Sequence, residues 1–534
     1  MDIHRTLILI FFPFYLSGVL CANQGNGEVA PNFILFYIDD LGWADTSVQM
    51  MEAEKDSKSN FYRTPNLELL AEDGMVFSNA YAPAPTCTPS RLSIQTGKTP
   101  ARLRCTIVND VMAFKEQLSW EDEISLADVL NATKQGYVSA HFGKGMGKDR
   151  MSDFGYSISD EYDSAPNGNY HGDYVDIRSR KPLPESDPKR INSLIKESRE
   201  FLDEYAGTKP FFMMISHYAV HVPYAADPEL IKEYAERLEP GNFNLNGYLA
   251  ADQPKNTDAG VYRRLQFAAM VDQIDQHLGQ VIAQLKSKGQ YENTYIIYTS
   301  DNGGGLGPNG PLRYGKATLF EGGLRVPMVV RGPGVLKGSR CATPVVQWDF
   351  LPTFHDLSKS LIELPEDLDG GSLRNVFEQG NAGSVERPFP GMVFHYPTYF
   401  AAPISVLRIG DYKYMKHLNS GEAKLFDMST DYRESTDICE LNDGLVKEFD
   451  GLLEDYLDQV NAYGVAEVYA ARYLQLDEFE RRAHEVFQQE QRKGSATKAV
   501  SLNKLEKELA RFKRNREEVV LNKNSNSWIK PGIE

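Results

Sequence analysis

Four short apolar segments, each followed by residues that can do chemistry, constrain the fold of this chain more than any other feature. Residues 32–38 form a continuous strand-like run, typical of a strand covered on both faces of a sheet. Similar runs occupy 137–142, 210–216 and 294–299, and helical patterns separate them, most clearly at 264–286. Strands that alternate with helices predict an α/β/α sandwich around a mainly parallel sheet.

The residues that follow these runs predict where a functional site lies. Ligands of open α/β sheets bind beyond the carboxyl ends of the strands, where the loops converge. A single polar residue at such a position can be a turn or capping residue, but four such ends together indicate a shared site. In chain order the ends carry Asp39 and Asp40, then Lys144, then His217 and His221, then Asp301 and Asn302.

The acidic and amide side chains among these residues predict a metal ion. Asp39, Asp40, Asp301 and Asn302 supply only oxygen ligands. Such ligands suit calcium or magnesium and disfavour zinc or copper. We therefore expect one hard divalent cation at the strand ends.

The strongest local signal begins at Cys87 and reads Cys-Thr-Pro-Ser-Arg-Leu-Ser-Ile-Gln-Thr-Gly. Thr88 can cap a helix that has Pro89 at its first position, and Gly97 can end that helix. Cys87 then lies beside a helix N-terminus, where the dipole and Arg91 lower the pKa of a thiol. From these residues alone we expect a nucleophilic thiolate.

This segment resembles the signature of the sulfatase family, C-x-P-S-R followed by T-G, in which the cysteine is oxidised to formylglycine. Further matches to the family occur in order over about residues 30–440. They are Asp39–Asp40, Thr64-Pro65-Asn66, Gly143–Lys144, His221 with Pro223, residues 300–304, Gly315–Lys316, residues 321–327, Leu425-Phe426-Asp427, Asp431 and Glu434.

The resemblance implies an alkaline-phosphatase-like fold and a formylglycine hydrate that attacks sulfur, made from Cys87 by a separate maturation enzyme. It also implies that the calcium ion and Lys144 neutralise sulfate oxygens, that Lys316 acts near the bridging oxygen and that Arg91 positions the hydrate. His221 can protonate the leaving alcohol, a task that Lys316 can share. The calcium ligands that the resemblance implies are Asp39, Asp40, Asp301, Asn302 and the modified Cys87.

One position departs from the family pattern. After Gly143–Lys144 many sulfatases carry Trp-His, whereas this chain has Gly145 and Met146. The missing histidine is the one that helps to deprotonate the covalent intermediate in the family. His141 can take over that task, or it can be a packed residue of its strand.

The resemblance predicts a sulfatase that hydrolyses a sulfate ester, on a carbohydrate. One alternative is a phosphodiester or phosphonate ester hydrolase on the same scaffold. Another is a non-catalytic relative that binds a sulfated sugar, an option that Met146 raises. Retention of Cys87, Lys144, His221 and Lys316 argues against the non-catalytic alternative.

The net charge of −17 excludes an extended surface for nucleic acid or anionic lipid, because such surfaces need clustered lysine and arginine. Anionic ligands must instead meet local basic groups. Since an acidic surface repels polyanions, we expect short saccharides or chain ends to be better substrates than long sulfated polymers.

The 534 residues are enough for two or three structural units. We predict a signal peptide over 1–22, a catalytic domain over 23–387, a small antiparallel sheet over 388–460 and a charged helical extension over 461–534. In the extension, an apolar pattern indicates a packing helix or a helix that binds a partner. That pattern consists of Leu502, Leu505, Leu509 and Phe512.

The apolar stretch over residues 6–20 precedes small residues near Cys21 and predicts secretion or a periplasmic location. It is short for a membrane span, and no later segment reaches about 18 uninterrupted apolar residues. A lipoprotein anchor at Cys21 is disfavoured because Leu20 is bulky. Of five cysteines, Cys105, Cys341 and Cys439 remain after Cys21 and Cys87 are set aside, which allows one disulfide without choosing it.

Overall fold

The computed structural model describes most of the chain from residue 30 to residue 493. The described ranges are 30–107, 123–146, 151–160, 175–176, 181–182, 187–238, 258–306, 309–398 and 401–493, with helical residues at 507, 510, 513, 514 and 517. The predicted signal peptide and the apolar pattern at 502–512 lie outside them. Within these ranges, no helix has the length and apolar character that a membrane crossing needs.

An eight-stranded sheet forms the centre of the molecule, in the order β11-β2-β10-β9-β1-β8-β4-β5. The four apolar runs of the sequence form its adjacent strands β4, β8, β1 and β9, which are parallel. β10 is antiparallel to its neighbours, so the predicted mainly parallel sheet is confirmed. The strands are β1 (Asn32–Ile38), β2 (Met75–Phe77), β4 (Val138–Gly143), β5 (Ile158–Ser159), β8 (Phe211–Ser216), β9 (Thr294–Ser300), β10 (Met328–Arg331) and β11 (Ser339–Cys341).

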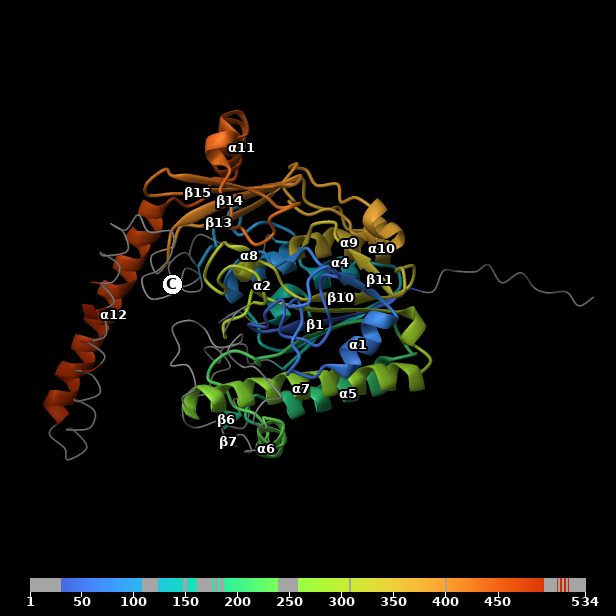
Figure 1. Ribbon diagram of the computed structural model, residues 1–534. Helices are drawn as coiled ribbons and strands as arrows, with labels where there is room; N and C mark the ends of the chain where they lie inside the picture. The colour runs from blue at the N-terminus through green and yellow to red at the C-terminus, as the bar shows by residue number, and fades with distance from the viewer. Residues whose placement is uncertain are drawn as a thin grey trace, which may run out of the picture.

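Helices cover both faces of this sheet because alternate residues of each buried strand point to opposite sides. Ile34 and Phe36 of β1 pack with one group of helices, and Phe33 and Leu35 pack with the other. Figure 1 shows α5 and α7 below the sheet and α2, α4 and α9 above it, which confirms the α/β/α sandwich. The first group contains α1 (Pro65–Glu72), α5 (Ile191–Tyr205) and α7 (Asp258–Ser287); the second contains α2 (Cys87–Thr96), α4 (Leu126–Asn131) and α9 (Phe350–Ser358).

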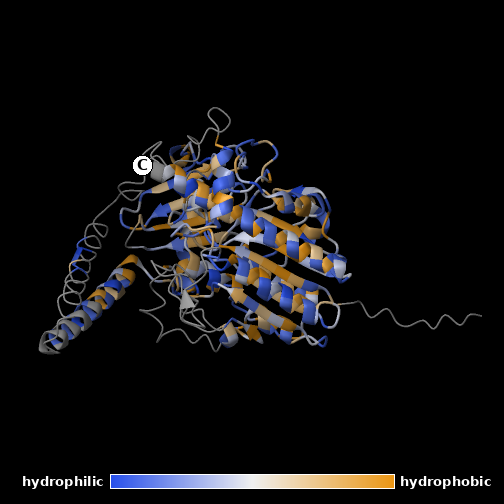
Figure 2. Cartoon of the chain, turned by 90° about the horizontal axis from the view of Figure 1, so that it is seen from below, coloured by the Kyte–Doolittle hydropathy of each residue, from blue (hydrophilic) through white to orange (hydrophobic). Residues whose placement is uncertain are grey.

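Seen from below, the helices on this face carry both hydrophilic and hydrophobic residues, whereas the strands behind them are mainly hydrophobic (Figure 2). This distribution matches an amphipathic helix that packs on a buried sheet. It explains why the strands read as continuous apolar runs in the sequence.

A second, four-stranded sheet lies over the upper helices and is antiparallel throughout (Figure 1). Its inner face packs on Trp348 and Phe320 of the larger unit, and its outer face carries α11 (Asp443–Gln459). α12 (Val465–Lys493) extends away from the body of the molecule. The strands are β13 (Met392–Tyr396), β14 (Ile404–Ile409), β15 (Tyr412–His417) and β16 (Ala423–Asp427).

Two local expectations need correction. α2 begins at Cys87 with Thr86 as its flanking residue, so the predicted cap at Thr88 lies inside the helix. The expected end is confirmed, since Gly97 has a φ of +68° in the left-handed region that glycine favours. The described cysteines are Cys87, Cys105, Cys341 and Cys439, and no disulfide joins any two of them.

Candidate active site

The residues that follow the four parallel strands lie together at one edge of the central sheet. Because adjacent parallel strands end at the same edge, residues far apart in the sequence become neighbours. These residues are Asp39 and Asp40 after β1, Lys144 after β4, His221 after β8, and Asp301 and Asn302 after β9. Cys87, the first residue of α2, joins them: one ligand atom from each of Asp39, Cys87 and Asp301 lies within 4.8 Å of the other two.

The acidic side chains crowd into a buried space. Asp39 and Asp301 have no exposed surface, and Asp40 is 5% exposed. The backbone N–H of Asp40 donates to Oδ1 of Asp301 at 3.1 Å, and Nδ2 of Asn302 donates to Oδ1 of Asp40 at 2.8 Å. Burial and the neighbouring charge of Asp39 raise the pKa of Asp301 to about 7. Carboxylates held this close favour a cation between them.

Two oxygen atoms in this cluster support the same conclusion. Oδ1 of Asp39 and Oδ1 of Asn302 are buried and have no hydrogen-bond partner among the described residues. Buried polar atoms are nearly always satisfied, so unsatisfied oxygens indicate a ligand position. Carboxylate and amide oxygens are the donors that calcium and magnesium prefer. The residues therefore fit a hard divalent cation.

Two lysines contact the carboxylates, one at Asp39 and the other at Asp40. Nζ of Lys144 lies 2.5 Å from Oδ2 of Asp39, and Nζ of Lys316 lies 2.7 Å from Oδ1 of Asp40. Burial opposes the charge on both ammonium groups, but the carboxylates outweigh it and the pKa of each lysine is raised. Burial likewise opposes a charged Asp39, yet Lys144 and other cations hold the pKa of Asp39 well below its usual range. Both lysines remain charged at neutral pH.

Arg91, one turn into α2, holds the strand ends together. Its Nε and Nη2 atoms lie 2.9 Å and 2.8 Å from Oδ2 of Asp301. Its Nη1 donates to the carbonyl oxygen of Lys144 at 2.8 Å and to Oγ of Ser216 at 2.5 Å. Arg91 is 2% exposed, so it orients Asp301 from beneath the site.

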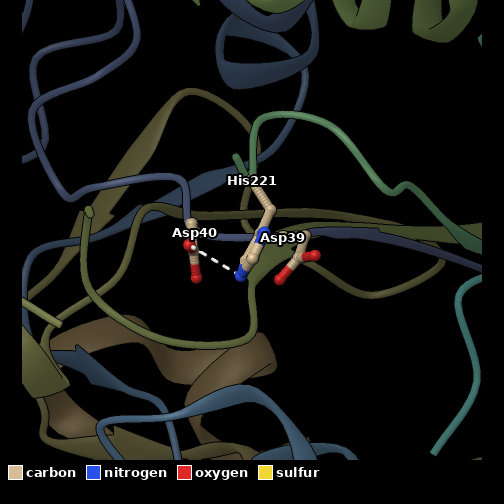
Figure 3. A group of neighbouring side chains, drawn as sticks. All are labelled: Asp39, Asp40 and His221. Carbon is tan, nitrogen blue, oxygen red and sulfur yellow. Dashed lines mark ion pairs between the residues drawn. The ribbon is translucent and has the colours of Figure 1, made fainter. Parts of the chain in front are cut away.

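His221 lies between the carboxylates of Asp39 and Asp40 (Figure 3). Its Nδ1 is 2.7 Å from the carbonyl oxygen of Val222, which can only accept, so Nδ1 carries a proton. Nε2 then faces Asp40, 3.6 Å from Oδ2. Burial lowers the pKa of His221, although Asp39 and Asp40 act in the opposite direction. The Nε2 atom is therefore the position at which this side chain can exchange a proton.

The family model described as sulfatase matches residues 31–360, more than half of the chain. The chain belongs to the sulfatase family. It is thus a sulfuric ester hydrolase with the alkaline-phosphatase-like fold that the sequence predicted. A second family model, described as the C-terminal part of N-sulphoglucosamine sulphohydrolase, matches residues 312–461 and covers the small sheet.

Known proteins similar to this sulfatase include a sulfatase of Formosa agariphila, 26% identical over 81% of this chain and 89% of the relative. The N-acetylglucosamine-6-sulfatase of Bos taurus is 30% identical over 54% of this chain and 55% of its own length. A solved structure in complex with its substrate D-glucosamine-2-N,6-O-disulfate has a TM-score of 0.59, with 21% identity over 81% of this chain and 98% of that one. The phosphonate monoester hydrolase of Agrobacterium radiobacter has a TM-score of 0.57, with 18% identity over 80% of this chain and 96% of that one.

His217 does not join the site of this sulfatase, which corrects the grouping of the third strand end. Its side chain is fully buried and its Nε2 lies 3.2 Å from Nδ1 of His277 on α7. The ring of Phe36 stacks on it at 6.3 Å. Burial lowers the pKa of His217 to about 3, so the residue is neutral and structural. The strand pattern places two histidines after β8 without choosing between them, whereas the family resemblance selects His221.

The side chains of His141 and Met146 both lie in the core. His141 packs edge-on against Tyr156 at 5.5 Å, and burial together with Arg91 lowers the pKa of His141 to about 3. Met146 is 4% exposed and belongs to the apolar cluster above the sheet. The structure thus favours the packed alternative for His141.

Sequence analysis missed Lys189, a buried residue in the turn before α5 that is 1% exposed. Burial lowers the pKa of Lys189 to about 7, while the charges of Asp39 and Asp40 act in the opposite direction. Because no strand-like run precedes Lys189 in the sequence, the pattern of strands followed by polar residues could not predict it.

Proposed function

We propose that this sulfatase removes sulfate from a saccharide through a formylglycine made from Cys87 and one bound calcium ion. The observation that carries the proposal is the position of Cys87, whose sulfur lies within 4.8 Å of ligand atoms of Asp39 and Asp301. A thiol is a poor ligand for a hard cation such as calcium. An oxygen nucleophile made from Cys87 would instead lie next to both the cation and the lysines. The names of the relatives, which refer to sulfated amino sugars, support the saccharide class.

The calcium ion would be held by Asp39, Asp40, Asp301, Asn302 and the modified Cys87, and when bound it supplies positive charge to the sulfate oxygens. The hydrate of formylglycine supplies the attacking hydroxyl. Lys144 adds a second positive charge for the developing negative charge. Arg91 fixes Asp301 through its two contacts of 2.8 Å and 2.9 Å, so the ligand carboxylate keeps its orientation.

Lys316 and His221 both contact Asp40 and act on the leaving alcohol. The ammonium of Lys316, paired with Asp40 at 2.7 Å, stabilises charge on the bridging oxygen. His221 can pass a proton from Nε2 when the ring is in its imidazolium form, because Nδ1 keeps its own proton on the carbonyl oxygen of Val222. Both groups favour a poor leaving group such as a sugar hydroxyl.

A phosphonate ester hydrolase is the second candidate, and the shared fold with the Agrobacterium radiobacter enzyme supports testing it. A panel of defined mono- and disulfated saccharides, assayed beside phosphonate and phosphodiester substrates, separates the two functions. We expect turnover of at least one sulfated saccharide at a rate well above that of every phosphorus ester. Faster turnover of a phosphonate would overturn the proposal.

We also propose that the chain is secreted or periplasmic, with cleavage after residues 1–22, and that a maturation enzyme converts Cys87. The apolar segment at 6–20 supports export. N-terminal sequencing of protein recovered outside the cytoplasm tests the cleavage. A mature protein that begins at Met1 would contradict it.

A further inference from the structure

A buried ionic cluster joins the small sheet to the catalytic unit. Nζ of Lys413, on β15, lies 2.8 Å from Oε1 of Glu321 and 2.7 Å from Oε1 of Glu434. Oε2 of Glu321 accepts hydrogen bonds from Nε of Arg325 at 2.7 Å and from the hydroxyl of Tyr81 at 2.9 Å. Two carboxylates thus balance two cations, and all four charged groups are at most 1% exposed. We call these five residues the Lys413 cluster.

The Lys413 cluster holds both ends of the segment that carries Lys316. Oε2 of Glu434 accepts from the backbone N–H of Glu321 at 2.8 Å, at the start of α8 (Glu321–Leu324). The carbonyl oxygen of Glu434 accepts from Nη1 of Arg313 at 2.6 Å. The N–H of Gly322 also donates to the carbonyl oxygen of Arg313 at 2.9 Å, and this hydrogen bond joins the two ends of the segment.

The opposite side of the same segment is fixed to active-site loops. The N–H of Lys316 donates to the carbonyl oxygen of Gly304 at 3.2 Å, and that of Ala317 donates to Pro85, two residues before Cys87, at 2.8 Å. Lys316 therefore lies on a segment held between the small sheet and the site.

The backbone of the segment needs such support. Tyr314 and Ala317, on either side of Lys316, have φ angles of +56° and +67°, in the left-handed region that side chains other than glycine disfavour. Backbone of this kind persists only where the surroundings over-determine it. α8 also packs closely against the backbone of Tyr314. A Cβ on Gly322 would lie 2.1 Å from the carbonyl oxygen of Tyr314.

We propose that Lys413 and Glu434 are positioning residues of the active site, which fix α8 and Arg313 and thereby hold the ammonium of Lys316 against Asp40. The small sheet then helps to position a catalytic group. This inference rests on the proposed function, in which Lys316 acts on the leaving oxygen. It predicts that changes in the cluster act through Lys316.

The test compares Lys413→Met, Glu434→Gln and Arg313→Met with Lys316→Ala. Arg313 is only partly buried and contributes one hydrogen bond to Glu434, so we expect its variant to fold even if the other two variants do not. On a sulfated sugar, whose alcohol leaves poorly, we expect each variant to lose about 10²-fold in kcat, as expected when a catalytic group is displaced by about 1 Å. On 4-nitrophenyl sulfate, whose leaving group needs little help, the loss should be much smaller.

A double-mutant cycle decides whether the effect passes through Lys316. In the Lys316→Ala background, Lys413→Met and Arg313→Met should each change kcat by less than about twofold, because the group they position is gone. Binding of inorganic sulfate, measured by calorimetry, provides the same cycle without turnover. The binding cycle tests the positioning role even if the enzyme turns nothing over. Failure of the proposed function would instead appear as a wild-type protein that is inactive on every sulfate ester.

Leu453→Ala is the matched control for general loss of stability. Leu453 is fully buried in the apolar cluster on the outer face of the same sheet, away from the inner face that carries Met415 and, by alternation, Lys413. This variant should unfold at a lower temperature and keep the wild-type ratio of kcat on the two substrates. Additive losses in the cycle, or a leaving-group-dependent loss in Leu453→Ala, would overturn the inference.

Discussion

Nζ of Lys144 lies 2.5 Å from Oδ2 of Asp39, although the two residues are 105 positions apart in the chain. Lys316 and Asp40 form a second pair of the same kind. In the proposed function, a calcium ion bound by these carboxylates would compete with Lys316 for the oxygens of Asp40, whereas Oδ1 of Asp39 is open beside the pair with Lys144. Calcium binding would then release the ammonium of Lys316 toward the sulfate, so that metal occupancy would determine the positive charge available to the substrate.

Removal of calcium should abolish turnover, because the sulfate then loses the positive charge of the cation and faces the carboxylates without it. The fold should survive with a lower unfolding temperature, since a ligand bound only to the native state stabilises it. Activity assays and thermal scans after chelation, followed by addition of calcium or zinc, measure both effects. Calcium should restore activity better than zinc. Full activity after exhaustive metal removal, verified by elemental analysis, would exclude the metal role.

Cys87 should appear as formylglycine in peptide mass spectra of the active protein. Cys87→Ala should abolish turnover and shift the unfolding temperature by no more than about 4 °C, because losing one small side chain costs on the order of 1 kcal/mol. Cys341→Ala is the control, since that thiol is equally buried but lies on β11. An active preparation that contains only unmodified Cys87 would defeat the assignment.

Breakdown of the covalent intermediate should be the slow step, because Met146 cannot transfer a proton and His141 is packed in the core. A lost general base slows a step by about 10²- to 10⁴-fold. Rapid-mixing assays should show a burst of alcohol followed by slow turnover in the wild type. Met146→His should quicken the slow phase, and the control Met146→Leu should not. Absence of a burst, with turnover unchanged in both variants, would show that another group performs this proton transfer.

Acidification should destabilise the protein through its buried histidines. Burial lowers the pKa of His217 to about 3, below the unfolded value of about 6.5, so the unfolded chain binds the extra proton first. The stability from this group is complete above about pH 6.5 and falls by about 1.4 kcal/mol per pH unit below it. Denaturant titrations at pH 7 and pH 5 should show this slope reduced in His217→Gln. The control His484→Gln changes only a side chain that is 56% exposed and should leave the slope intact.

Short saccharides or chain ends should be hydrolysed faster than the interior of long sulfated polymers. The net charge of −17 repels a polyanion everywhere except at the lysines of the site. Added salt should therefore raise activity on polymers by screening that repulsion and should have little effect on a disaccharide. Kinetic assays over a range of ionic strength measure the difference. A preference for long chains that salt abolishes would contradict the expectation.

The strands and their polar ends could be predicted because each buried strand is a continuous apolar run that stops at a charged residue. β1 and β9 match the predicted runs to within one residue. The strand pattern could not choose between His217 and His221, because that choice depends on how the loop turns after β8, and only the family resemblance selects His221. The pairing of Lys413 with Glu321, 92 positions away, has no local signal at all. Such long-range ionic contacts are fixed by how two sheets pack and not by any pattern within one segment.

The bond between Arg91 and Asp301 joins residues 210 positions apart, so the site cannot assemble until most of the chain has been made. At about 5–20 residues per second, synthesis of that interval takes roughly 10–40 s. During this time the contact between Arg91 and Asp301 cannot form, whereas in the folded protein it is made and Cys87 is only 5% exposed. In the proposed function, an enzyme that oxidises this cysteine would therefore work on the growing or newly exported chain, and the strand order of the sheet would set the time that it has.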